Sequence, residues 1–263
     1  QAYADAPQTA VTPTLNDYVV AGAQGVTSAN LPALNSALAA SSITATQVDT
    51  LPELQTLVDA YNRILAEANG AANDLTVADP TAAQYLAIGA NIGLAAQSTA
   101  QGANALALLN DSLGAQTSAN VDSVGDINTL AATVNSLLTT AAGGTGSPVL
   151  TAADLAQLGL TGLSDSAMAV FLQLVAATAD DGSGLASLSQ LQSLADTAMA
   201  RADALGTIAS YAQANAAING LAVPSAATYS TAGVTLPTVA GLSPAQVVEA
   251  LNSALLTTSV NGP

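Results

Sequence analysis

The sequence predicts an all-α protein made of tandem three-helix modules, of which the last is incomplete. Three observations carry this prediction. A helix-start pattern recurs about every 70 residues, which indicates internal repetition. Apolar residues in the longest helical stretches follow the 3.6-residue period of an amphipathic helix. No stretch alternates apolar and polar residues with the β-branched enrichment of a strand, so we expect almost no sheet.

The first helix of each module is short and has both a start signal and a stop signal. A Ser or Thr is followed four residues later by Tyr or Leu, and eight residues later by Gly. The hydroxyl can accept a backbone N–H at the helix start, and glycine can adopt the left-handed conformation that ends a helix. The predicted starts are Thr14, Thr81, Thr151 and Ser225, and the predicted stops are Gly22, Gly89, Gly159 and Gly233.

The second helix of each module carries leucine and asparagine at helical spacing. It is recognised at residues 33–41, 108–116 and 250–258, with 171–179 as a divergent copy. An asparagine recurs at one place in three of these stretches, as Asn35, Asn110 and Asn252. Because buried polar groups need hydrogen-bond partners, we interpret these asparagines as residues that set the packing register rather than as ligand contacts.

The third helix begins with the best-marked caps of the chain. An acidic or amide side chain three residues after a Ser or Thr can close a capping box. Such pairs are Thr50 with Glu53, Ser123 with Asp126, and Ser187 with Gln190. From Ser187 the helical pattern continues to Gly220 with only Gly206 interrupting it, which predicts one long helix.

These signals divide the chain into an N-terminal segment and four modules. Residues 2–6 resemble residues 210–214, so we interpret the start of the chain as the tail of a third helix. At the other end, position 260 is where a further third helix is due, and a module without it should expose an apolar groove that favours association. The predicted ranges are 1–13, 14–79, 80–149, 150–224 and, as a partial module, 225–263.

Residues 25–70, and above all "VDTLPELQTLVDAYNRIL" at 48–65, resemble a known family. They are similar to the GA-type three-helix module of albumin-binding surface proteins of Gram-positive bacteria. They are even more similar to the degenerate GA-like repeats of very large secreted surface proteins and adhesins of proteobacteria. The resemblance implies a three-helix fold and a bacterial cell-surface location. It does not extend to albumin binding, because the ligand face of that family is not legible in these residues.

The composition excludes several classes of function. The chain has no His, Cys or Lys, and two Arg against 18 acidic residues give a net charge of −16. Without His or Cys there is no ready near-neutral acid/base, thiolate or usual zinc site, so we expect no enzymatic activity. The negative charge repels nucleic acid and anionic lipid. The most apolar stretch, 167–179, falls short of the roughly 20 residues of a membrane span.

Two kinds of candidate site remain. Asp180 and Asp181 precede Gly-Ser-Gly and could begin a calcium loop, the one cofactor considered; the later oxygens and Glu of such a loop are missing, which favours a solvated acidic turn. Arg63 and Arg201 occupy similar places in two third helices. Each could anchor a neighbour's carboxylate or form an ordinary pair on its own helix surface. The candidate interface residues are Arg63, Arg201, Tyr229, Leu251 and Leu255.

We therefore predict an extracellular structural protein that packs with copies of itself into a fibre, sheath or S-layer-like lattice. An acidic, Lys-free chain rich in Ala, Ser, Thr and Gly is typical of a secreted bacterial surface protein. The alternative is a segment of an adhesin that binds a protein or glycan, with modules on a stalk; flexible linkers such as 141–148 favour it. A third possibility, an ice-binding protein, lacks a regular threonine array.

Overall fold

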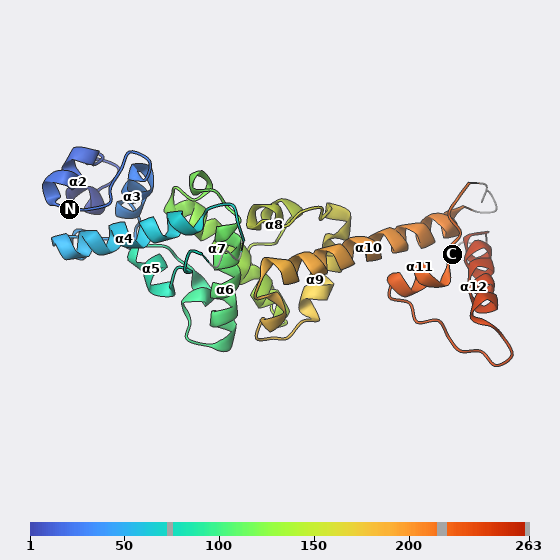
Figure 1. Cartoon of the computed structure of the whole chain (residues 1–263). Coiled ribbons are helices and arrows are strands. Elements are labelled where there is room, and N and C mark those ends of the chain that lie inside the picture. The colour runs from blue at the N-terminus through green and yellow to red at the C-terminus, as the bar shows by residue number, and fades with distance from the viewer. Residues whose placement is uncertain (73–75, 215–219, 261–263) are drawn as a thin grey trace. The chain divides into compact units, whose positions relative to one another are not determined.

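The computed structural model describes residues 1–72, 76–214 and 220–260, with side chains up to Leu256. Within these residues the protein is all-α, as predicted (Figure 1). The described chain has no β-strand, and one isolated antiparallel bridge joins Asn69 and Thr117. None of its described helices combines the length and the apolar character that a membrane crossing needs.

The helices follow one another in a repeated order. Set 1 comprises α2 (Leu15–Ala21), α3 (Leu31–Leu38) and α4 (Leu51–Glu67). Set 2 comprises α5 (Ala82–Ala87), α6 (Ala100–Gly114) and α7 (Val124–Ala141). Set 3 comprises α8 (Ala152–Leu158), α9 (Met168–Ala176) and α10 (Leu188–Gln213). The helix α1 (Ala2–Asp5) precedes these sets, and set 4 comprises α11 (Ala226–Thr231) and α12 (Pro244–Val260).

The predicted start and stop signals of the short first helices are confirmed. All four N-cap residues, Thr14, Thr81, Thr151 and Ser225, form reciprocal capping boxes. The four stop glycines have φ between +79° and +112°, the left-handed region in which a side chain is strained. The sequence alone therefore locates the ends of these helices.

The caps of the third helices match the prediction except in set 3. Thr50 and Ser123 form complete capping boxes. Ser187 Oγ accepts the Gln190 N–H at 3.3 Å, but Gln190 Nε2 donates to the Ser183 carbonyl instead of returning to Ser187. The third cap is therefore half of the predicted box.

The helix α10 is shorter than the stretch from Ser187 to Gly220 that the sequence predicts. It ends at Gln213, where the Ala214 N–H turns back to the Tyr211 carbonyl at 3.3 Å. A bond to the third preceding residue tightens the last turn of a helix. The remaining predicted residues 215–219 lie outside the described residues.

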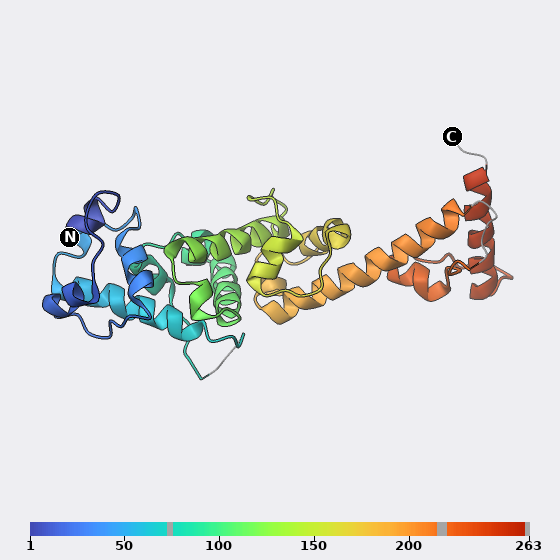
Figure 2. The ribbon, with the colours of Figure 1, turned by 90° about the horizontal axis from the view of Figure 1, so that it is seen from above.

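The chain divides into two compact units. Unit 1 consists of Gln1–Thr161 and Val175–Gln192, and unit 2 consists of Gly162–Leu174 and Ser193–Pro263. Because residues 150–224 contribute to both units, the units do not coincide with the predicted modules, and the module limits stay a prediction. In unit 1, α3 lies beside α4 and α6 beside α7, and in unit 2, α11 lies beside α12 (Figures 1 and 2).

Candidate functional site

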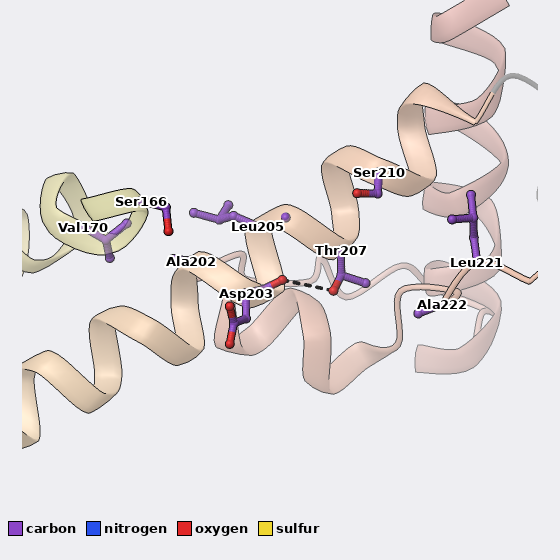
Figure 3. Close-up of a pocket in the computed structure, with 10 residues that line it drawn as sticks. Ser166, Val170, Ala202, Asp203, Leu205, Thr207, Ser210, Leu221 and Ala222 are labelled. Atoms are coloured by element: carbon purple, nitrogen blue, oxygen red, sulfur yellow. Dashed lines mark hydrogen bonds between the residues drawn. The ribbon is translucent and has the colours of Figure 1, made fainter. Parts of the chain in front are cut away.

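An open hollow of about 690 Å³ in unit 2 is lined by one carboxylate, three hydroxyls and apolar side chains (Figure 3). Its polar groups include the exposed carboxylate of Asp203 and the hydroxyls of Ser166, Thr207 and Ser210. Thr207 Oγ1 donates to the Asp203 carbonyl at 3.0 Å. The described residues that line the hollow include no cation and no second carboxylate, so they cannot form the acid and base pair of a hydrolase.

The calcium candidates Asp180 and Asp181 lie in an exposed turn after α9. The Ser183 N–H donates to Asp181 Oδ1 at 2.9 Å, and this bond lowers the pKa of the Asp181 carboxyl. The Asp180 and Asp181 carbonyls accept from Gln101 and Asn104 of α6, at 3.5 and 2.8 Å. In the described parts of the chain, no three side chains of His, Cys, Asp or Glu gather to hold a metal ion. Calcium binding stays a prediction, and the geometry is that of a capped turn.

The two arginines lie at boundaries between helix sets. Arg201 Nε donates to the Ala232 carbonyl at 3.1 Å, so it joins α10 to the end of α11 within one chain. Its partner is a main-chain carbonyl and not the predicted carboxylate. Arg63 is half-buried beside an open hollow that Asp59 and Asp79 also line. The carboxylate of Asp59 accepts from Gln55 Nε2 at 2.8 Å, and the predicted helix-surface pair of Arg63 stays a prediction.

The three candidate interface residues of set 4 differ in their exposure. Tyr229 was predicted at an interface between subunits, but it is 4% exposed and donates to Asn252 within its own set. It is therefore a core residue. Leu251 and Leu255 on α12 are half-buried and have part of their surface available.

A buried tyrosine–asparagine clamp recurs in sets 1, 2 and 4. The tyrosine of the first helix donates its hydroxyl to an asparagine Oδ1 of the second helix, at 2.6 to 2.8 Å. The same asparagine donates through Nδ2 to the carbonyl of the proline before the first helix, at 2.8 to 3.0 Å. The three asparagines are buried and hydrogen-bonded, as predicted, while their role in setting the packing register stays a prediction. The clamps are Tyr18–Asn35–Pro13, Tyr85–Asn110–Pro80 and Tyr229–Asn252–Pro224.

Burial raises the pKa of the clamp tyrosines above the ordinary value near 10. For Tyr18 and Tyr229 the neighbouring Tyr3 and Tyr211 add to the rise. For Tyr85 the charges of Glu67 and Asp79 add to it. The clamp tyrosines are therefore neutral donors at neutral pH.

The helix α1 near the start of the chain lies against set 1. Tyr3 lies on α1 as Tyr211 lies near the end of α10, and each acts on the clamp tyrosine of the next first helix. The helix α1 is held in place because Asp5 Oδ1 accepts the Ala45 N–H at 2.7 Å. The residues of α1 therefore pack on set 1, and their equivalence to the tail of a third helix stays a prediction.

A second recurring contact, which we call the amide latch, ties each third helix to the loop after the first helix. The latch side chain is always the fifth residue after the N-cap of the third helix. Its amide oxygen accepts the N–H of the tenth residue after the N-cap of the first helix, at 2.7 to 2.9 Å. The latch pairs are Gln55 with Gln24, Asn128 with Asn91, and Gln192 with Thr161.

Contacts between successive sets also repeat. The N–H of Val124, the first residue of α7, donates to Ser36 Oγ of α3 at 2.9 Å. One set further on, the N–H of Leu188, the first residue of α10, donates to Asp111 Oδ2 of α6 at 2.7 Å. Ser36 and Asp111 each follow a clamp asparagine directly. We call this pairing the stacking contact.

A second bond accompanies the stacking contact. Ser42 Oγ donates to the Gly89 carbonyl at 2.9 Å, and Gln116 Nε2 donates to the Gln157 carbonyl at 2.8 Å. Both donors follow a second helix, and both acceptors lie at the end of the next first helix. At Gly89 a Cβ would lie 2.7 Å from Ala40 Cβ, so glycine is needed both for its φ of +79° and for this close approach.

The latches and the stacking contacts were not predicted from the sequence. A signal for the latch was present, because an amide residue recurs at one position of three third helices. The stacking acceptors vary between Ser and Asp, and their donors are backbone groups that no sequence pattern marks. No protein-family model, no curated protein and no solved structure matches this chain, so the resemblance to GA-like modules stays a prediction.

Proposed function

We propose that this chain is an extracellular structural protein of a bacterial surface assembly, in which helix sets pack against copies of the same chain. The observation that carries the proposal is the stacking contact, which the chain forms twice with residues at equivalent positions. A surface that joins one set to the next inside a chain can also join two chains. The proposed assembly is a fibre, a sheath or an S-layer-like lattice, and the proposed role is not enzymatic.

The chemistry of the stacking contacts suits association of a strongly acidic protein. The side chains that make them are Ser36, Ser42, Asp111 and Gln116, three of which are neutral, and their partners are main-chain groups. With a net charge of −16, contacts built from charged pairs would need cations that the chain lacks. Hydroxyl and amide contacts avoid this need. The extracellular bacterial location rests on composition and on the resemblance to surface repeats.

A ligand-binding adhesin segment is the second candidate. The sequence favours this candidate because residues 141–148 are predicted to form a flexible linker. In the structure this linker packs on α7. Ser136 Oγ donates to the Pro148 carbonyl at 2.7 Å, and the Gly144 N–H donates to the Thr139 carbonyl at 2.9 Å. The observation that still favours an adhesin is the open hollow of unit 2, with apolar walls and three hydroxyls at which a ligand could bind.

Electron microscopy of the purified chain tests the proposal. We expect ordered polymers under native conditions at physiological salt. A strictly monomeric chain at high concentration would refute the structural role. The adhesin candidate is tested by pull-down of host or matrix proteins and by binding to a glycan array. Variants of the unit 2 hollow, such as Leu205→Glu, serve as the control. Binding that is lost in these variants would then decide for the adhesin.

A further inference from the structure

In sets 2 and 3 the preceding set covers the first residue of the third helix. Val124 is 5% exposed and Leu188 is 8% exposed, and each donates its N–H to a second-helix side chain of that preceding set. The first N–H groups of a helix have no acceptor within the helix. The stacking contact therefore provides an acceptor that this N–H lacks within its own helix.

The third helix of set 1 has the same start without this cover. Leu51 is 46% exposed, although it occupies the position of Val124 and Leu188. Within the described residues no acceptor is provided for its N–H. Gly22, which ends α2, packs on it, since a Cβ at Gly22 would lie 3.3 Å from Leu51 Cδ2. We call Thr50 and Leu51 the α4 start.

The helix α12 presents the opposite half of the stacking contact. Ser253 directly follows the clamp residue Asn252, as Ser36 follows Asn35 on α3. The side chain of Ser253 is exposed, and its hydroxyl oxygen is of the same type as the Ser36 acceptor. An acceptor at the stacking position is therefore on the surface of set 4.

The residues around Ser253 are also more exposed than their equivalents on α3. Ala254 is exposed, and Leu251 and Leu255 are half-buried. At the equivalent positions of α3, which α4 and α7 contact, no side chain is more than 5% exposed. These equivalents are Leu34, Ala37 and Leu38. We call Leu251, Ser253, Ala254 and Leu255 the α12 face.

We infer that the α12 face binds the α4 start of a second copy of the chain, with Ser253 Oγ accepting the Leu51 N–H. The inference rests on the proposed self-association and names the surfaces that would carry it. One chain carries both halves of a contact that it already forms twice internally, so the new interface continues an existing one. The two halves differ, and such a heterologous contact builds an open head-to-tail polymer when its rotation does not close a ring.

Like charges flank the two surfaces and set the conditions of the test. Glu249 lies one helical turn before Ser253 on α12. Glu53 lies two residues after Leu51, the last residue of the α4 start. Salt at about 0.15 M screens charges beyond about 8 Å. Association is therefore measured at this ionic strength, where repulsion between two chains of net charge −16 is weakened.

The first experiment compares Ala254→Glu with Ala209→Glu by sedimentation velocity. Both positions are exposed and helical, so the two variants change charge and helix propensity equally. We expect Ala254→Glu to weaken association about tenfold or more, as for a group buried at an interface centre. Ala209→Glu should associate as the wild type does. Equal association of the two variants would overturn the inference.

The second experiment does not depend on the stability of any one variant. The natural chain has no Cys, so mixing Leu51→Cys chains with Ser253→Cys chains permits a disulfide only between molecules. On mild oxidation we expect crosslinking of this mixture to exceed that of Ala209→Cys with Ser253→Cys. If the wild type assembles and the two mixtures crosslink equally, the interface is wrong but self-association stands. If the wild type stays monomeric, both proposals fail.

Discussion

Set 3 lacks the clamp that sets 1, 2 and 4 share, although it keeps the other recurring contacts. Four residues after its N-cap stands Leu155 in place of a tyrosine, and Leu150 replaces the proline before the cap. Gln173 aligns with the asparagine and is exposed. The latch of Gln192 and the stacking contact of Leu188 are nevertheless present in this set.

All three clamp residues are replaced together in set 3, which indicates that the clamp is present or absent as one element. A buried hydroxyl that loses its acceptor costs its full desolvation energy, whereas apolar replacement of both partners can be nearly neutral. Leu150 and Leu155 are both buried, so the third set fills this region with apolar side chains. The clamp is therefore one of two ways to build the core, while latches and stacking contacts hold the sets in order.

The largest effect is expected from breaking one clamp on one side. Asn110→Leu leaves the Tyr85 hydroxyl and the Pro80 carbonyl buried without their partner, and should lower the free energy of unfolding by about 3 kcal/mol. Native-state hydrogen exchange of α5 and α6 measures this loss. Adding Tyr85→Leu should restore part of it, since the hydroxyl is then gone. A double variant whose loss equals the sum of the single losses would refute the clamp as one element.

The converse change adds a tyrosine to the set that lacks the clamp. Leu155→Tyr places a hydroxyl at a fully buried site without an asparagine partner and should cost about 2 kcal/mol. Leu155→Phe is the matched control, because it adds the ring alone. Urea unfolding of both variants separates the ring from the hydroxyl. If tyrosine is tolerated better than phenylalanine, another group in set 3 accepts the tyrosine hydroxyl, and the expected cost of an unpaired hydroxyl is wrong.

Alkaline pH should weaken the clamps. The pKa of Tyr85 is raised, chiefly by burial, so the unfolded chain loses this proton first as the pH passes about 10. The folded state then holds more protons, and stability falls with rising pH by about 1.4 kcal/mol per pH unit for each such tyrosine until its folded pKa is reached. Hydrogen exchange or urea unfolding between pH 9.5 and about 11 tests this slope. Tyr85→Phe should reduce the slope, and an unchanged slope would contradict the assignment.

The smallest losses of stability are expected from removing an amide latch. They should be equal in a set with a clamp and in set 3, which lacks one. Gln55→Ala and Gln192→Ala each remove an amide latch on the protein surface, which we expect to cost about 1 kcal/mol. Hydrogen exchange of the loops after α2 and α8 reports each loss locally. Losses that differ by more than about 1 kcal/mol would mean that the latch depends on the clamp.

Much of the fold could be predicted from the sequence because its signals are local. Caps such as Thr50 with Glu53, and stops such as Gly89, act within a few residues, and their patterns were sufficient to place the first helices and the starts of the third helices. The five short 3₁₀ turns among the described residues were missed, since they lack a periodic apolar pattern. The early end of α10 at Gln213 was missed because the apolar pattern continues past it.

The candidate site was less predictable, because its contacts join residues far apart in sequence. The burial of Asn110 could be predicted from the recurrence of an asparagine among leucines at helical spacing, but its tyrosine partner could not. Tyr229 was assigned to an interface, although its hydroxyl is used inside the core. The stacking contact involves the backbone of Val124 and Leu188, and a backbone N–H leaves no mark in the sequence.

Light scattering over a concentration series at physiological salt tests the central claim most directly. If the stacking contact also joins chains, the weight-average mass should rise steadily above 25.5 kDa with concentration, as in open-ended polymerisation. A mass that stays at 25.5 kDa at every concentration would contradict the account.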